Sequence, residues 1–159
     1  MRAVVQRVSR ARVLVDGETV GEVERGLCVL LGVADGDDEA VAARLAGKVA
    51  RLRIFENEDG KFDRSVVDEG GGALVVSQFT LLADTSKGNR PSFAAAAPPE
   101  TAERLYRAFC EGLAAEGVGV ARGRFGARMR VEIANDGPVT IVLDAGGTKA
   151  TADGGPLLS

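Results

Sequence analysis

Residues 73–84 (ALVVSQFTLLAD) change character within one residue, and this change restricts the fold more than any other feature of the chain. The stretch opens with apolar residues 73–76, which are typical of a strand buried inside a sheet. The four residues that follow are Ser77, Gln78, Phe79 and Thr80. A buried hydroxyl or amide must find a hydrogen-bond partner, and a bound substrate can supply one. The pattern fits a strand end that lines a pocket, although a strand whose last residues simply reach the surface is the more frequent explanation.

The chain before this stretch predicts an antiparallel start. Residues 2–8, 12–15 and 19–23 have the composition of strands, and Asp16-Gly17 is the dipeptide most favoured in two-residue hairpin turns. Residues 27–33 (LCVLLGV) form a continuous apolar run. Such a run predicts a strand that is buried on both faces of the sheet.

Two segments predict helices that pack on a core. Residues 37–52 begin with two aspartates, which suit the first turn of a helix. Residues 98–117 begin with Pro98-Pro99 and end at Gly117, a natural C-terminal cap. Apolar residues recur at helical spacing in both segments: Val41, Leu45, Val49 and Leu52 in the first, and Ala102, Leu105, Phe109 and Leu113 in the second.

The rest of the chain predicts a short strand at residues 53–55 and two alternating strands at residues 127–134 and 139–144. Residues 135–138 (NDGP) separate the last two strands. Proline cannot donate a hydrogen bond, so it belongs at the start of a strand or at an edge. The residues favour an ordinary hairpin with Pro138 at strand entry, but a rigid wedge is the alternative, since a cis Gly-Pro bond costs only ~0.5–1 kcal/mol.

The element order predicts a single α+β domain. We expect a mixed, largely antiparallel sheet, partly barrel-like, against which the two helices pack. A chain of 159 residues fits one domain and can bury a full core. Residues 145–159 are rich in Gly, Ala and Thr without periodicity, which predicts a flexible C-terminal tail.

Composition narrows the chemistry that this chain can perform. It contains no histidine, which removes the commonest general base, the commonest metal ligand and every Ser-His or Cys-His pair. Cys28 and Cys110 lie apart in apolar contexts, so we expect buried thiols, no disulfide, no metal and no cofactor. The absence of a signal-like or membrane-spanning apolar run predicts a cytoplasmic protein.

Charge alone does not predict a nucleic-acid partner. The net charge is −3 at neutral pH, so an anionic polymer would need a local basic patch. Residues 83–98 form a long irregular segment, which is uncommon in a small domain unless it is functional or disordered. Its Lys87 and Arg90 are the cations best placed to meet a phosphate near residues 77–80, although solvated loop charges are the more frequent explanation.

Several motifs occur together and in order, and the ordered set is highly specific. They are MRAVVQRV, VDGETVGEVERGL, LRIFENEDGK, VVSQFTLLADTSKGNRPSF, GRFGARM and NDGPVT. Over residues 1–144 the chain resembles the D-aminoacyl-tRNA deacylases, also described as D-tyrosyl-tRNA deacylases. The resemblance implies a deacylase domain at 1–144 and assigns no role to residues 145–159.

The resemblance implies a hydrolase that cleaves the ester between a D-amino acid and the 3′-terminal adenosine of tRNA, a chiral proofreader in translation. Glycyl-tRNA would also be a substrate. Family members are homodimers whose active site lies at the subunit interface. There Ser77, Gln78, Phe79 and Thr80 of one chain would meet a Gly-cisPro pair from the other. The resemblance assigns that pair to Gly137 and Pro138, its orientation to Arg7, and a place beside the pocket to Met129.

The resemblance also leaves questions of chemistry open. Without histidine, Thr80 has no evident base, and the terminal 2′-hydroxyl of the RNA is implied to assist, with N–H groups near Phe79 and Thr80 binding the oxyanion. A trans Gly-Pro deacylase of mischarged L-alanyl-tRNA and a non-enzymatic tRNA-end binding module are the alternatives. The chain departs from the family at Arg128, where an acid is common, and at Phe62-Asp63, which replace a commoner Met-Asn.

Overall fold

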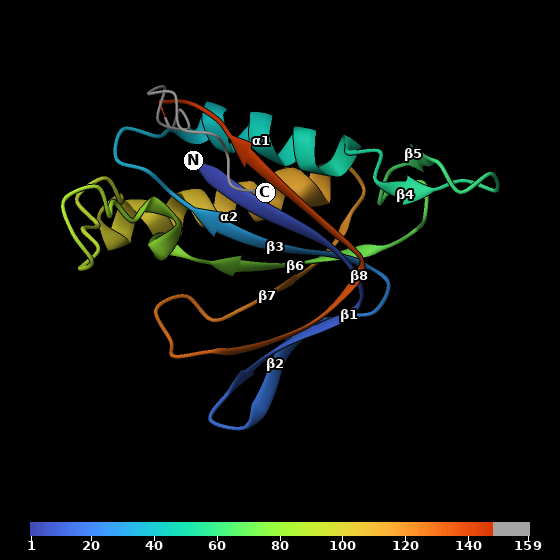
Figure 1. The fold of residues 1–159 in the computed structure, drawn as a ribbon, viewed down its shortest axis with the longest axis horizontal. Helices are drawn as coiled ribbons and strands as arrows, with labels where there is room; N and C mark the ends of the chain where they lie inside the picture. Colours follow the sequence, from blue (N-terminus) through green and yellow to red (C-terminus); the bar gives the residue numbers. More distant parts are fainter. Residues whose placement is uncertain (148–159) are drawn as a thin grey trace.

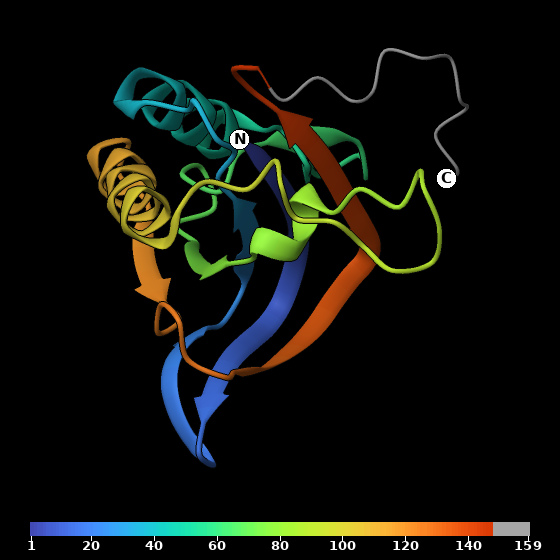
Figure 2. The same cartoon turned by 90° about the vertical axis from the view of Figure 1, so that its left-hand side faces the viewer.

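The structure is a computed structural model, and it describes residues 1–147. One long strand, β1, organises a six-stranded sheet that two helices cover on one face (Figures 1 and 2). The elements in chain order are β1 (Arg2–Val15), β2 (Glu18–Val23), β3 (Gly26–Gly32), α1 (Glu39–Arg51), β4 (Phe55–Glu56), β5 (Phe62–Arg64), β6 (Gly72–Ser77), the 3₁₀ helix η1 (Phe79–Leu82), α2 (Pro99–Ala115), β7 (Gly119–Arg122) and β8 (Arg130–Asp144).

The sheet is mixed and nearly closed. Along one edge β1 pairs with β8, and along the other it pairs first with β3 and then with β2, all antiparallel. β3 then pairs with β6, and β6 with β7, both parallel. The first and last strands of this order, β2 and β7, lie close to each other. A side chain at Gly21 on β2 would collide with the carbonyl oxygen of Arg122 on β7. The predicted α+β domain with a partly barrel-like, largely antiparallel sheet is confirmed.

Both predicted helices form, although α1 begins at Glu39, so that neither predicted aspartate lies in its first turn. The Asp38 carboxylate accepts a hydrogen bond from the backbone N–H of Val41 (3.0 Å) and caps α1. Pro99 occupies the first turn of α2, where its missing N–H costs nothing. Asp37 lies before the helix rather than in its first turn. Its carboxylate is 2.8 Å from the N-terminal amino group of Met1 and accepts the N–H of Ala34.

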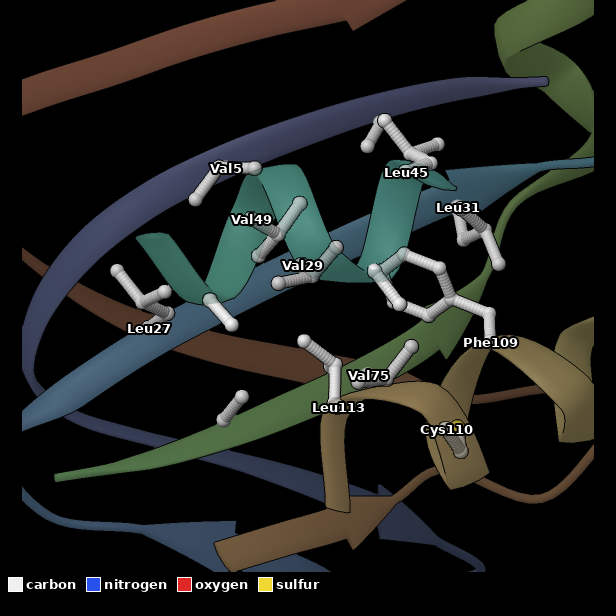
Figure 3. Close-up of a cluster of buried hydrophobic side chains, with 14 of the residues drawn as sticks. Val5, Leu27, Val29, Leu31, Leu45, Val49, Val75, Phe109, Cys110 and Leu113 are labelled. Atoms are coloured by element: carbon white, nitrogen blue, oxygen red, sulfur yellow. The ribbon is translucent and has the colours of Figure 1, made fainter. Parts of the chain in front are cut away.

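The core lies between the helices and the sheet (Figure 3). Val5, Val29 and Val75 come from the sheet, Leu45 and Val49 from α1, and Phe109 and Leu113 from α2. A second buried cluster fills the other face of the sheet: Val8, Ala11, Val13, Val15, Cys28, Leu74 and Val76. The β6 strand is therefore buried on both faces, as its apolar run predicts.

The two cysteines are buried and free, one in each cluster. Burial raises the pKa of Cys28 to about 11 and that of Cys110 to about 11, so both are protonated at neutral pH. Neither helix has the length and apolarity of a membrane span within residues 1–147.

Several local predictions are wrong. Residues 2–8 and 12–15 form one strand, β1, because β8 pairs with both halves. The strand predicted at residues 53–55 is Phe55–Glu56, which pairs with β5, a strand the sequence did not predict. β7 was also not predicted. Residues 148–159 of the predicted tail lie outside the described residues, whereas Ala145 exchanges two backbone hydrogen bonds of 2.9 Å with Met1.

The predicted hairpin at residues 135–138 is also wrong. Val8 pairs with Asn135 and Gln6 with Thr140, so β8 continues in the same direction along β1 on both sides of the motif. Residues 136–139 therefore form a bulge opposite Arg7. Because β1 supplies partners for both halves of β8, the chain does not need to reverse there.

Candidate active site

The polar stretch after β6 leaves the sheet as a tight turn. β6 ends at Ser77, and the backbone N–H of Gln78 still donates to the Leu31 carbonyl of β3 (2.7 Å). The chain then folds into η1, which packs directly on the end of β3. A side chain at Gly32 would force this contact to shift, since its Cβ would lie 2.4 Å from Leu82 Cδ2 and 3.1 Å from the Gln78 carbonyl oxygen. The sequence predicted that this segment continues the strand. In the structure it is instead a 3₁₀ helix that begins at Phe79.

A cavity of about 710 Å³ opens beside this turn. It is lined by Val33, Val76, Ser77, Gln78, Phe79, Phe93, Ala96, Ala97, Pro98, Pro99, Ala102, Phe125, Gly126, Ala127, Met129 and Val131. The end of β6 does line a pocket, which decides between the two interpretations of its sequence. Every lining residue is uncharged, so the site offers apolar surface, one hydroxyl, one amide and the backbone.

Two aromatic rings form one wall of the cavity. Phe79 and Phe93 meet edge to face, with ring centroids 5.0 Å apart. Phe79 is 56% exposed, which is unusual for a phenylalanine and leaves its ring accessible from the cavity. Thr80 lies next to Phe79 but is not among the lining residues, and its hydroxyl accepts a hydrogen bond from the Gln78 amide.

A second part of the lining comes from the segment before β8. Phe125, Gly126, Ala127 and Met129 line the cavity, while Arg124 and Arg128 of the same segment are exposed and do not line it. The predicted place of Met129 beside a pocket therefore has a structural counterpart. The charge of Arg128 therefore lies on an exposed residue that is not part of the lining.

The backbone at the start of η1 provides hydrogen-bond donors. Within residues 1–147 the N–H groups of Phe79 and Thr80 donate to no backbone or side-chain acceptor, since the first turn of a helix has no internal partners for them. Such donors bind an oxyanion well, because they are already oriented. The site can thus stabilise developing negative charge without a charged side chain.

The second predicted group of residues lies in the bulge of β8. The Gly137-Pro138 peptide bond is cis, and both residues are exposed. Asn135 closes the bulge, because its side chain accepts the Val139 N–H (3.0 Å) and donates to the Thr140 hydroxyl (3.1 Å). The bulge is held from within the strand.

Arg7 holds the same bulge from β1. It is only 6% exposed, and its Nε–H donates to the main-chain oxygen of Asp136 (3.3 Å). Its Nη1–H donates to the carbonyl of Ile54 (2.8 Å). Carboxylate oxygens of Asp136 and Glu56 lie 3.3 Å and 3.5 Å away, and the Phe62 ring centroid lies 5.7 Å from Cζ.

Within one chain the two groups of predicted residues do not meet. In the ladder Arg7 pairs with Leu27 and Leu27 with Ala73, whereas Ser77 pairs with Leu31. The bulge opposite Arg7 therefore lies about 13 Å along the strands from the level of Ser77, at 3.3 Å per residue. Neither Gly137, Pro138 nor Arg7 lines the cavity.

The predicted tRNA-contacting cations lie on a loop that stands out from the body (Figure 1). Residues 83–98 contain no helix or strand, as predicted, and backbone hydrogen bonds of 2.8 Å and 2.9 Å between Asp84 and Ser92 close the base of the loop. Hydrogen bonds from Ser86 lower the pKa of Asp84. Lys87 and Arg90 are exposed and form no ion pair with any residue of 1–147.

Sequence reasoning missed several residues of the site. Phe93 and Phe125 line the cavity, and Glu56 and Phe62 surround Arg7. A signal existed for Phe93, which lies within the irregular segment 83–98 that the sequence singled out. None existed for Glu56 and Phe62, because the β4–β5 pairing brings them to Arg7 from a distant part of the sequence.

The architecture is shared with two solved structures. One, described as a c-Myc DNA unwinding element binding protein, is 46% identical with a TM-score of 0.84, over 91% of this chain and 98% of that chain. The other, from a structural analysis of a probable eukaryotic D-amino acid tRNA deacylase, is 20% identical with a TM-score of 0.75, over 89% of this chain and 97% of that chain. By its fold and site, the protein is an α+β domain with a nearly closed sheet and a neutral cavity at the end of β6.

Sequence comparison assigns the family. Residues 4–144 match the model of the family described as D-Tyr-tRNA(Tyr) deacylase. D-aminoacyl-tRNA deacylases of Cereibacter sphaeroides and Ruegeria pomeroyi are 59% and 61% identical, over 91% of this chain and 100% and 99% of their own lengths. That of Deinococcus deserti is 59% identical, over 91% of this chain and 99% of its own. The chain belongs to this deacylase family, which confirms the resemblance seen in its motifs.

Proposed function

We propose that the protein hydrolyses the ester bond of D-aminoacyl-tRNA and releases a free D-amino acid and tRNA. The observation that carries this proposal is the neutral cavity at the end of β6 in a chain of the deacylase family. The backbone N–H groups of its lining residue Phe79 and of the next residue, Thr80, donate to no acceptor within residues 1–147. Such a cavity suits an uncharged nucleoside and an ester carbonyl. The Phe79 ring offers a surface on which a base stacks.

The reaction needs no charged side chain in the cavity. Water attacks the ester carbonyl carbon, the carbonyl oxygen becomes an oxyanion, and the bond to the ribose oxygen then breaks. The backbone N–H groups of Phe79 and Thr80 bind the oxyanion, and one such donor typically contributes ~2.7–4 kcal/mol to the transition state. The proton from the water passes to the ribose oxygen, with the neighbouring 2′-hydroxyl of the RNA assisting. The alternative is attack by the Thr80 hydroxyl.

We assign the selection against L-amino acids to the Gly137-Pro138 bulge of a second copy of the chain. Gly137 and Pro138 are exposed and held by Arg7 and Asn135, yet they lie away from the cavity of their own chain. In a homodimer the bulge of one protomer would enter the cavity of its partner. Rigid backbone there would exclude an L side chain by steric conflict without recognising any particular side chain. Action on glycyl-tRNA follows, because glycine has no side chain to exclude.

Exposed cations lie in two segments that also contribute residues to the cavity lining. Lys87 and Arg90 belong to the loop 83–98, whose Phe93 lines the cavity, and Arg124 and Arg128 are next in sequence to the lining residues Phe125 and Ala127. None of the four is ion-paired within residues 1–147. Phosphates on either side of the terminal nucleotide would meet these cations. A protein of net charge −3 needs a local group of cations to meet RNA, and we assign that role to these four residues.

The decisive experiment is deacylation of D-tyrosyl-tRNA and L-tyrosyl-tRNA, side by side with a Thr80→Ala variant. We expect rapid loss of the D ester alone, and survival of that activity in the variant, because the backbone supplies the donors. Loss of activity in the variant would assign the chemistry to the Thr80 hydroxyl. Binding of tRNA without turnover would support the binding module, and hydrolysis of L-alanyl-tRNA alone would support the other deacylase type.

A further inference from the structure

We propose that the β4–β5 hairpin is a positioning element for the Gly137-Pro138 bulge, and that Phe62 and Glu56 act as positioning residues through Arg7. The proposal rests on the function proposed above. It concerns the two hairpin side chains, neither of which lines the cavity.

Arg7 joins the hairpin to the bulge. On the bulge side its Nε–H donates to the main-chain oxygen of Asp136, directly before Gly137. On the hairpin side its Nη1–H donates to the Ile54 carbonyl at 2.8 Å, one residue before β4. A guanidinium is planar and rigid, so its position on one side fixes its position on the other.

Glu56 and Phe62 complete the hairpin side of this contact. The Glu56 carboxylate lies 3.5 Å from Nη2 of Arg7. The Phe62 ring faces the guanidinium at 5.7 Å. Phe62 is 53% exposed, although a ring of that size is usually buried. The Phe62 ring lies over the nearly buried guanidinium of Arg7, which explains its exposed position. The ring attracts the positive charge and shields it from water.

The hairpin is firm enough to position another group. The side-chain oxygen of Asn57 accepts the N–H groups of Asp59 (2.9 Å) and Lys61 (3.1 Å) and so closes the turn. Arg53 donates to the main-chain oxygen of Asp63 (2.7 Å) and also pairs with its carboxylate. Five residues thus fix the hairpin without using the Phe62 ring, which is left for Arg7.

The consequence concerns selectivity rather than chemistry. If Phe62 is truncated, the Arg7 guanidinium becomes more hydrated and more mobile. The bulge then loses part of its support. The cavity and the N–H groups of Phe79 and Thr80 remain, so hydrolysis of a D ester continues. Discrimination falls, because an L side chain is rejected only if the backbone that collides with it cannot move aside.

The test compares Phe62→Ala and Glu56→Gln with Phe62→Met and with Val67→Ala. Methionine is a long apolar side chain that can cover Arg7, and Val67 is an exposed apolar residue three positions after the end of β5. Single-turnover rates on D-tyrosyl-tRNA and L-tyrosyl-tRNA give the selectivity. Solvent exchange of the Arg7 Nε–H, followed by NMR, reports its hydrogen bond to Asp136 independently of activity.

We expect Phe62→Ala to lower the D-over-L rate ratio and to speed Nε–H exchange, each about fivefold to tenfold, as the loss of a partly shielded cation–π contact implies. Glu56→Gln should act in the same direction but more weakly, because Glu56 is half exposed. Phe62→Met should restore both quantities, and Val67→Ala should change neither.

Unchanged exchange in Phe62→Ala would overturn the positioning role. Faster exchange with an unchanged D-over-L ratio would overturn its link to selectivity. A wild-type protein that cleaves neither ester would refute the proposed function and selectivity with it, while the exchange measurement would still decide whether Phe62 positions Arg7.

Discussion

The Cα of Gly137 lies so close to the guanidinium of Arg7 that a Cβ there would be only 3.1 Å from Nη2. The same Cβ would lie 2.8 Å from Val139 Cγ2. Gly137 also has a φ of 125°, a conformation that L side chains rarely adopt. The site thus requires glycine for two independent reasons, one of the backbone and one of packing.

The substitution Gly137→Ala should therefore lower both stability and selectivity. The backbone conformation costs about 1–2 kcal/mol, and displacement of Arg7 adds to this cost. Urea unfolding measures the first effect, and the D-over-L rate ratio measures the second. Gly36→Ala is the matched control, since Gly36 has a φ of 88° but no atom within 4 Å of its Cβ position. Equal effects of the two substitutions would show that the contact with Arg7 is unimportant.

Removal of the Asp37 carboxylate should strongly destabilise the fold. The Asp37 side chain is 3% exposed and its carboxylate lies 2.8 Å from the N-terminal ammonium, so Asp37→Asn removes the negative charge from this pair. Breaking a buried pair from one side typically costs about 3–5 kcal/mol. The neighbouring Asp38→Ala removes only a helix cap, worth about 1 kcal/mol. Urea unfolding of the two variants should separate them, and similar losses would contradict a strong buried pair.

Alkaline pH should destabilise the protein through its buried thiols. Cys28 and Cys110 have a pKa of about 11 in the folded state against 9.0 as the ordinary value, and burial also raises the pKa of Tyr106. The folded state therefore binds more protons than the unfolded state between pH 9 and 11. The contribution of these groups to the free energy of unfolding is complete below pH 9 and decreases as the pH rises toward 11.

Two measurements check this expectation. Urea unfolding at several pH values gives the slope, which Cys28→Ala should reduce. A thiol reagent at pH 8 should react with neither cysteine of the folded protein and with both after denaturation. Rapid reaction of the folded protein would show that the thiols are accessible.

Removal of the cations beside the cavity should weaken tRNA binding without changing selectivity. Lys87→Ala, Arg90→Ala and the double variant Arg124→Ala/Arg128→Ala remove charges that would meet phosphates. For single-stranded nucleic acid, each lost phosphate contact should reduce the slope of log K against log salt by about 0.7. Arg44→Ala, an exposed cation of α1 without an ion pair in the described part of the chain, is the control. Equal slopes for all variants would remove these cations from the RNA contact.

Local sequence was sufficient where one face of an element meets one core. The stripe Ala102, Leu105, Phe109 and Leu113 predicted α2, and these residues are buried against the sheet. The abrupt change at Ser77 predicted a pocket as one of two outcomes, and the cavity is there. In both cases the side-chain pattern reports the burial directly.

Local sequence was insufficient where the outcome depends on a distant partner. Apolar and polar side chains alternate in residues 127–134 and in residues 139–144. This alternation, with its period of two, is the same whether the chain reverses between the two segments or continues as one strand. The β1 strand decided the outcome, because it is long enough to pair with both halves of β8. Similarly, β4 and β5 are too short to be recognised alone, and it is their pairing that brings Phe62 over Arg7.

The sequence by itself determined the α+β class, the two packing helices, the chemistry excluded by the lack of histidine, and, through its ordered motifs, the family. Tertiary structure alone decided that Asn135 to Val139 include a bulge and not a hairpin turn, and that Arg7 lies buried between this bulge and the β4–β5 hairpin. The physical reason is that periodicity and turn preference act between neighbours along the chain, whereas hydrogen-bond partners across a sheet are chosen by strands far apart in it.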